Sequence, residues 1–282
     1  MTKGHFRPWL FAIIVFMHVM ALYGLWYVST HHGFNLKTCV WFLGIYILRQ
    51  EGVSLGSHRL FTHVAFKCDF ATKVVLAFCA GLSAEGPLKS WCADHWQHHK
   101  DTEGPWDPHS PGRYSSRWKG FWWSHMVWLF FEVKRPPDVD FDHMFERREP
   151  RLNRWDKWIF PVAVLSGFVF PLCFAGVNGL LLAGFVGVVF HWHATWSINS
   201  IAHILGSTNR FHKGRKDTSK NNPYLALISW VGEPFHDNHH AKPNSARLGW
   251  KWYQFDLGYW TIRLLLEPLG LAWDVILPPA DA

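Results

Sequence analysis

Long apolar runs alternate with polar, aromatic-rich stretches along this chain of 282 residues. The first run contains a single strongly polar side chain, His18, and is long enough to span a bilayer as a helix at about 1.5 Å per residue. The second run continues without a helix stop through Arg49 and Glu51 into polar sequence. The pattern therefore predicts two membrane-spanning helices, over residues 10–28 and 38–57.

Two further apolar runs follow one another closely in the second half of the chain. Pro161 and Pro171 interrupt the first of them, which lipid-embedded helices tolerate where neighbouring groups satisfy the freed carbonyls. A turn at residues 176–178 leads into the second, whose final part is polar. A helix over that second run is about 37 Å long and exceeds a hydrocarbon core of about 30 Å, so its end should leave the membrane. These runs predict membrane spans over 158–177 and 179–203.

A shorter apolar stretch, residues 70–86, is preceded by polar sequence and is too short to cross a bilayer twice. We expect it to be an amphipathic helix lying along the membrane interface. The remaining segments, 58–157 and 204–282, should build a water-facing helical cap. The sequence thus predicts one all-α integral membrane domain over residues 1–282, with four transmembrane helices.

Basic residues are distributed unevenly about the predicted spans. Seven lie in loops on the side of the cap, whereas the opposite loops hold only Lys37. By the positive-inside rule, the cap and both termini are expected in the cytoplasm. The seven are Arg147, Arg148, Arg151, Arg154, Lys213, Arg215 and Lys216.

Composition agrees with a membrane protein that has a large aqueous part. The chain is 49% hydrophobic and contains 19 Trp and 23 Phe, yet its mean hydropathy is only -0.04. The net charge of +7 comes from short basic segments beside apolar runs, which suits an anionic membrane surface better than nucleic acid. The five Cys have no regular spacing, so we expect neither a disulfide framework nor a thiolate metal site.

Histidines gather at three places in the chain. Two clusters have the spacing i, i+3, i+4, which places three imidazoles on one side of a helix, and a looser pair lies five residues apart. Neutral imidazole is a common ligand of iron, copper and zinc, so repeated clusters predict a metal site. The clusters are His58 and His63; His95, His98 and His99; and His236, His239 and His240.

A ninth histidine, His203, shares a helical face with Asn199 near the polar end of the fourth run. A lone histidine near a membrane interface is more often a packing or hydrogen-bonding residue than a ligand. The three clusters expected on the same side nevertheless favour a ligand role here. Nine imidazoles suit two ions with four or five ligands each, and they do not choose the metal, because zinc also accepts imidazole.

These clusters and the segments around them resemble the membrane fatty acid desaturases of the stearoyl-CoA (delta-9) type. The resemblance runs from Gly52 to Asp256 and rests on motifs at characteristic intervals. They are Gly-Ser-His-Arg-Leu-Phe-Thr-His at 56–63, Asp-His-Trp-Gln-His-His-Lys at 94–100, Asp-Pro-His at 107–109, residues 119–125 and 195–203, Gly-Glu-Pro-Phe-His-Asp-Asn-His-His-Ala at 232–241, and Ser-Ala-Arg at 245–247.

The resemblance implies four transmembrane helices beneath a cytosolic cap and a non-haem di-iron centre. It gives the ligand role to the nine histidines named above and a water-mediated metal contact to Asn199. It also implies that O2 and two external electrons are used to introduce a cis double bond, most commonly at carbon 9, into a long saturated acyl chain. Whether the substrate is an acyl-CoA or an acyl-lipid stays open.

Carboxylates near the clusters are candidates to hold the far ring nitrogens of the ligands. Each is equally well interpreted as a helix cap or a surface charge. The candidates are Asp94, Asp101, Glu103, Asp107, Glu233 and Asp237. We expect structural or hydrogen-bonding roles for His109 and His125, whereas His191 and His193 have no assigned place.

The acyl chain needs an apolar tunnel, and Trp91, Trp192 and Trp196 are candidates to line it. For any one of them, core packing or interface anchoring is the commoner role. Lys119, with Arg113 and Arg117, is a candidate contact for the phosphate of CoA or a phospholipid, or faces water.

Two other classes of function remain open at this stage. A related di-iron hydroxylase or ketolase would use the same centre, and a histidine-rich metal transporter or sensor would use the same ligands. No ferredoxin-like or haem-binding segment is recognisable, so electrons should come from a separate cytochrome b5, ferredoxin or rubredoxin with its reductase. A bacterial cytoplasmic membrane is favoured over the endoplasmic reticulum.

Overall fold

The computed structural model describes residues 4–31 and 33–280. Within these ranges the chain is helical, and β-type pairing is limited to isolated bridges such as that between Phe6 and Phe131. The expected all-α class is thus confirmed for the described residues.

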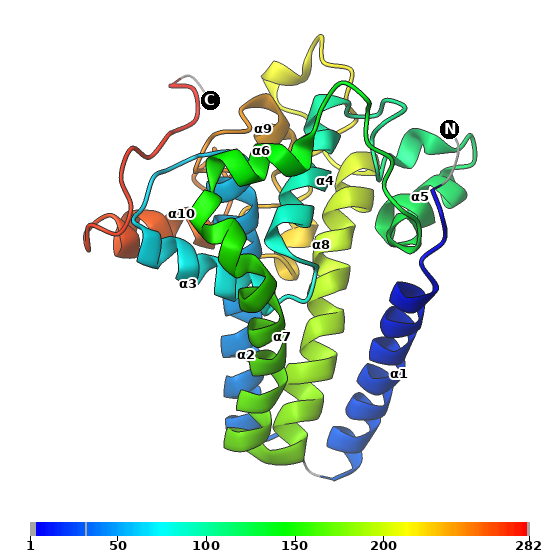
Figure 1. Ribbon diagram of the computed structural model, residues 1–282, viewed down its shortest axis with the longest axis vertical. Coiled ribbons are helices and arrows are strands. Elements are labelled where there is room, and N and C mark those ends of the chain that lie inside the picture. The colour runs from blue at the N-terminus through cyan, green and yellow to red at the C-terminus, as the bar shows by residue number, and fades with distance from the viewer. Residues whose placement is uncertain (1–3, 32, 281–282) are drawn as a thin grey trace.

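Four long helical segments run side by side and form a stem, with a cap of shorter helices at one end (Figure 1). The first and last described residues both lie at the cap end. The stem consists of α1 (Pro8–Thr30), α2 (Leu36–Glu51) with its π-helical continuation η1 (Gly52–Thr62), α7 (Pro150–Gly179), and α8 (Gly187–Ile204) with the π-helical stretch η4 (Leu180–Val186) before it.

Local sequence explains how the stem helices begin and turn back. Asn35 caps α2 by accepting a hydrogen bond from the backbone N–H of Thr38, whose hydroxyl accepts one from the backbone of Asn35 in return. Near the end of α7 the chain reverses at Gly176, whose φ of 64° lies in the left-handed region. Glycine adopts this conformation readily because it has no Cβ.

The outer surfaces of the stem are apolar and exposed. Examples are Leu22 on α1, 68% exposed, and Leu165 on α7, 63% exposed. Contiguous apolar surface of this kind is normally covered, and a lipid bilayer covers it along a whole helix. Two helical segments, Pro8–Thr30 and Pro150–Ile204, are long and apolar enough to cross a membrane, and the second includes the reversal at Gly176.

The cap lies over the end of the stem, and α3 (Phe70–Gly81) crosses between the two (Figure 1). This helix occupies the place of the expected interfacial helix over 70–86 but ends at Gly81. The other cap helices are α4 (Leu88–Lys100), α5 (Arg117–His125), α6 (Phe141–Arg148), α9 (His236–Ala241) and α10 (Leu257–Thr261).

A buried arginine joins the stem to the C-terminal part of the cap. Arg59 on η1 donates to the Asp256 carboxylate at 2.9 Å and to the carbonyl oxygen of Ala246 at 2.7 Å. Asp256 also accepts from the backbone N–H of Leu248 at 2.7 Å. A buried charge needs such partners, because burying it alone is costly. The network fixes η1 at the position where it presents its neighbour, His58.

Candidate metal centre

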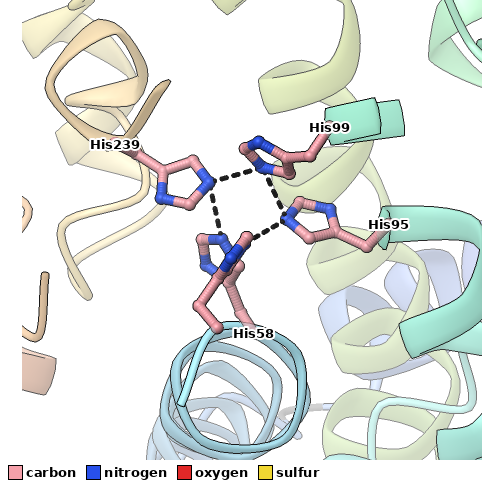
Figure 2. Close-up of side chains that lie close together, drawn as sticks. His58, His95, His99 and His239 are labelled. Atoms are coloured by element: carbon pink, nitrogen blue, oxygen red, sulfur yellow. Dashed lines mark hydrogen bonds between the residues drawn. The ribbon is translucent and has the colours of Figure 1, made fainter. Parts of the chain in front are cut away.

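The nine histidines named from the sequence come together in two groups at the junction of stem and cap. The ligand nitrogens within each group all lie within 4.8 Å of one another. The five-histidine group contains His58, His63, His95, His99 and His239, four of them labelled in Figure 2. The four-histidine group contains His98, His203, His236 and His240.

Helical periodicity divides the two i, i+3, i+4 clusters between the groups. Residues four apart on an α-helix share a face, and the residue between them is rotated away. On α4, His95 and His99 belong to the five-histidine group and His98 to the other. On α9 the division is reversed. His236 and His240, four residues apart, belong to the four-histidine group, and His239 belongs to the other. Each short helix therefore contributes to both groups.

The pair five residues apart needs a different helix. In an α-helix His58 and His63 would point in clearly different directions, since five residues rotate the chain by well over one turn. The chain is π-helical here, and the backbone N–H of His63 donates to the carbonyl oxygen of His58 at 3.1 Å. This i to i+5 pattern brings both imidazoles to the same face, as π-helical segments often do at functional sites.

Carboxylates hold the outer ring nitrogen of one ligand in the five-histidine group and two in the four-histidine group. Nδ1 of His58 lies 2.8 Å from Glu233, that of His98 lies 3.0 Å from Asp107, and that of His203 lies 3.1 Å from Glu103. An ionised carboxylate only accepts, so each Nδ1 carries the proton. The Nε2 atom of each ring is then a lone-pair donor facing the centre of its group.

The spacing of the Nε2 atoms fits a bound transition metal. Nε2 of His239 lies 3.0 Å from that of His58 and 2.7 Å from that of His99, and Nε2 of His236 lies 3.0 Å from that of His203. Lone pairs this close repel one another unless a cation lies between them. Metal–nitrogen bonds of about 2.1 Å at right angles would place neighbouring donors about 3.0 Å apart, as seen here. The all-imidazole set suits iron, copper or zinc.

Burial favours the neutral form of six histidines in the two groups. It lowers their pKa well below the ordinary value, and the neighbouring imidazoles lower it further; the six are His63, His95, His99, His236, His239 and His240. Burial also opposes the charge of His98, but the carboxylate of Asp107 outweighs it and raises the pKa of His98. Burial opposes ionisation of Glu103 as well, yet the hydrogen bond from His203 lowers its pKa to about 2.

These shifts predict that the metal-free protein is destabilised by mild acid. Below about pH 6.5 the six histidines become protonated in the unfolded chain but not in the folded chain. The free energy of unfolding therefore decreases as the pH is lowered. His98 acts in the opposite sense, because its raised pKa gives stability that is lost as the pH rises, but it is one group against six. The thermal midpoint of metal-depleted protein in detergent should therefore drop between about pH 7 and pH 5. A midpoint that stays constant or rises over that range would contradict buried, neutral ligands.

Three of the six candidate carboxylates contact ligands, and three do not. Asp94 pairs with Arg135 at 2.7 Å, and Asp101 accepts from the backbone N–H of Trp106 at 2.7 Å. Asp237 lies next to a histidine of the four-histidine group in sequence but is fully buried away from both groups, where it pairs with Arg215 and with Nδ1 of His212. These three instead connect their helices to neighbouring segments, and the buried Asp237 is neither a helix cap nor a surface charge.

The sequence reasoning missed one acidic neighbour of the four-histidine group. Asp217 lies 3.9 Å from Nδ1 of His240. It comes from the loop after α8, where no histidine motif marks it. In the same loop, Thr218 donates to Glu103, the carboxylate that holds His203. Only the fold brings this loop beside the ligands.

The three candidate tryptophans occupy different surroundings. Trp91 stacks on the ligand His95, with ring centroids 5.0 Å apart, and so lies beside the five-histidine group. Trp192 and Trp196 stack on each other in the core between α1 and α8, and the indole N–H of Trp192 donates to the carbonyl oxygen of Ser83 at 2.9 Å. Lys119 is exposed on α5.

The remaining polar residues from the motifs connect helices. His125 on α5 contacts His193 on α8 at 2.9 Å, and His193 contacts His18 on α1 at 3.2 Å. His191 lies 3.2 Å from the Glu85 carboxylate. Asn199 is half-buried on α8, one turn before His203. The expected hydrogen-bonding role of His125 is thus confirmed, whereas His109 stacks on His98.

A stem with long apolar outer faces, beneath a cap that gathers nine histidines in two groups that could each hold a metal ion, is typical of a membrane-type metalloprotein. Residues 53–276 match the model of the family described as fatty acid desaturase. The chain belongs to the fatty acid desaturase family and is an oxygen-dependent acyl desaturase, an oxidoreductase.

Three relatives illustrate the range of the family around this chain. It is 38% identical over 251 residues to the hex-5-enoyl-[acyl-carrier protein] acetylenase of Moorena producens (strain JHB), covering 84% of this chain and 76% of that protein. It is 31% identical over 268 residues to the sn-2 palmitoyl-lipid 9-desaturase of Nostoc sp. (strain 36), covering 93% and 87%. It is 34% identical over 244 residues to delta-9 acyl-lipid desaturase 1 of Arabidopsis thaliana, covering 83% and 73%.

Proposed function

We propose that this protein introduces a cis double bond at carbon 9 of a long saturated acyl chain carried by a membrane lipid, with two iron ions held by the nine histidines. The observation that carries the proposal is the two groups of converging Nε2 atoms, with carboxylates on the outer nitrogens of His58, His98 and His203. The lipid as carrier and carbon 9 as the position follow two of the relatives described above.

The overall reaction balances with two external electrons. One saturated acyl chain, one O2, two electrons and two protons give one unsaturated chain and two waters. The iron pair, when bound, supplies the activation of O2. The protein holds nine imidazole nitrogen donors in fixed directions, and three carboxylates keep the proton on Nδ1 of their partners. Burial of both groups excludes bulk water from the reacting carbon atoms.

Trp91 is the residue best placed to contact the acyl chain. It stacks on His95 and lines a small cavity with Ser57, Ser83 and Gly86. The cavity measures about 10 Å³, which is room for about one water molecule. An acyl chain would enter only if Trp91 or its neighbours moved. The roles of Trp192, Trp196 and Lys119 in substrate binding, and of Asn199 in a water-mediated metal contact, stay predictions.

We further propose that all four stem segments cross the membrane and that the cap faces the cytoplasm. The apolar outer faces of α1 and α7 support the crossing, and the basic residues on the cap side support the orientation. Electrons would then reach the centre from a separate cytoplasmic one-electron carrier. The location in a bacterial cytoplasmic membrane stays a prediction.

The proposal predicts a defined product in a bacterial host that lacks its own desaturase. Expression should convert saturated membrane lipids to monounsaturated ones, and mass spectrometry of derivatised fatty acids should place the double bond at carbon 9. The His239→Ala variant is the matched control and should give no product, because it removes a ligand nitrogen.

Each other product would point to a different member of the wider family. A triple bond would assign the chemistry printed in the name of the Moorena producens relative, and gain of one oxygen would indicate a hydroxylase. Unchanged lipids together with stoichiometric zinc would favour a metal transporter or sensor and would contradict the proposed function.

A further inference from the structure

A surface cavity lies behind the four-histidine group. Its volume is about 410 Å³, and it is bounded by the loop before η2 (Pro111–Arg113), by α5 and by the segment after η3 (Val127–Phe130). Aromatic side chains dominate its walls, among them Trp106, Trp123 and Trp128. The cavity wall also includes Asp107, the carboxylate that holds the outer nitrogen of His98. One residue thus touches both the cavity and a metal ligand.

Three aromatic rings in contact, the first pair tilted and the second stacked, join the cavity wall to the histidine group. The ring centroid of Trp128 lies 5.3 Å from that of His109, and His109 stacks on His98 at 4.4 Å with an angle of 28° between the planes. His98 is a member of the four-histidine group. The path from the cavity to that group therefore passes through ring contacts only.

Hydrogen bonding does not account for the two outer rings. Trp128 is 9% exposed and His109 is 5% exposed. The indole nitrogen of Trp128 and Nδ1 of His109 have no hydrogen-bond partner among the described residues. An unsatisfied buried donor or acceptor is destabilising, whereas a phenylalanine of similar shape would avoid that cost. Nδ1 of His109 lies 3.9 Å from the Asp107 carboxylate, beyond hydrogen-bond distance, while the ring itself lies between Trp128 and His98.

We propose that electrons enter the centre from this cavity, passing through Trp128 and His109 to His98. The inference rests on the proposed function, which requires two electrons per double bond from a separate one-electron carrier. In each transfer the carrier would give up one electron and be oxidised, and His98 would pass that electron to a ferric ion, reducing it to the ferrous state, if the four-histidine group holds iron. The rate of electron transfer falls steeply with distance, so a continuous column of rings through a buried wall gives a short route inward.

The test introduces electrons at a chosen surface point and needs no natural carrier. The exposed cysteines are first removed by Cys39→Ser and Cys173→Ser. Glu132, exposed on the cavity rim, is replaced by cysteine and labelled with a ruthenium–bipyridine photoreductant. A second labelled chain carries the same group at Lys216→Cys, an exposed position in the loop that covers the other side of the four-histidine group. Flash reduction of the ferric pair is followed by absorbance, with iron content measured on every variant.

From the label at position 132, Trp128→Leu and His109→Leu should each slow reduction by an order of magnitude, and Trp128→Phe should recover most of the rate. From the label at position 216 the same variants should have no effect. Trp250→Leu replaces a similarly buried tryptophan that lies off the route. It should change the reduction rate from neither label. This design separates a local path from a general loss of structure.

Two results would overturn the route. One is an unchanged rate from position 132 in both leucine variants, and the other is an equal fall from both labels. If His109→Leu loses iron, Trp128→Leu decides, because Trp128 lies one ring farther from the ligands. Photoreduction needs no substrate. A chain that is reduced along this path but forms no double bond would therefore refute the proposed function and leave the route standing.

Discussion

Replacing His236 or His239 with alanine should abolish desaturation and reduce the metal content from two ions per chain to one. The two residues lie on the same short helix, α9, but belong to different groups, so each variant should remove a different ion. The loss is large because each variant removes one of only four or five imidazoles within reach of its ion. Metal analysis of the purified variants measures the stoichiometry.

His143→Ala is the control for these variants. His143 is exposed on α6 and lies outside both groups, so this variant should keep two ions and full activity. If His236→Ala and His239→Ala each lost both ions, the groups would be one cooperative site. If either variant kept two ions, its assignment as a ligand would be wrong.

Removing the charge of an outer carboxylate should weaken one group selectively. Asp107→Asn and Glu233→Gln keep the shape of the side chain but lose the anion that holds the proton on Nδ1 of His98 or His58. Loss of such partners typically lowers metal affinity or activity by about 10–100-fold. Competition with a calibrated chelator should show weaker binding of one ion in each variant, with the second ion unaffected.

Asp138→Asn is the matched control for the carboxylates. Asp138 is exposed and pairs only at the surface with Lys100, so its amide should leave metal affinity unchanged. Equal weakening in all three variants would mean that overall charge, rather than the Nδ1 contact, sets the affinity.

The sequence predicted that these histidines come together, because helix periodicity encodes their shared faces directly. Two clusters with the spacing i, i+3, i+4 can only present several imidazoles to the same region when they are helical, and α4 and α9 are helical there. The division between the groups follows from the same geometry, although the spacing alone does not say which face meets which neighbour. The pair at His58 and His63 has no such explanation in an α-helix, and only the π-helical backbone of η1 accounts for it.

The partners of the ligands were less predictable, because they depend on packing between distant segments. Glu103 and Asp107 follow α4 closely in sequence, yet Asp101 beside them turns to a backbone N–H. Asp217 lies in a loop whose position over His240 is set by the fold. Proximity in the sequence thus identified candidate carboxylates, and the direction of each side chain in the fold determines which of them contact a histidine of the two groups.

In the stem, the apolar runs indicated the helices, since hydrophobic length is a local property. The end of α3 was harder to predict, because the apolar pattern continues for a few residues beyond Gly81 while the backbone turns. Ala84 in that turn has a φ of 56°, which the sequence does not suggest for alanine.

The most direct test of a two-ion histidine centre is anomalous diffraction from crystals of the purified protein, recorded on both sides of the iron absorption edge. The account predicts two iron peaks, one enclosed by the five-histidine group and the other by the four-histidine group. A single peak, or peaks that lie outside these nine imidazoles, would contradict it.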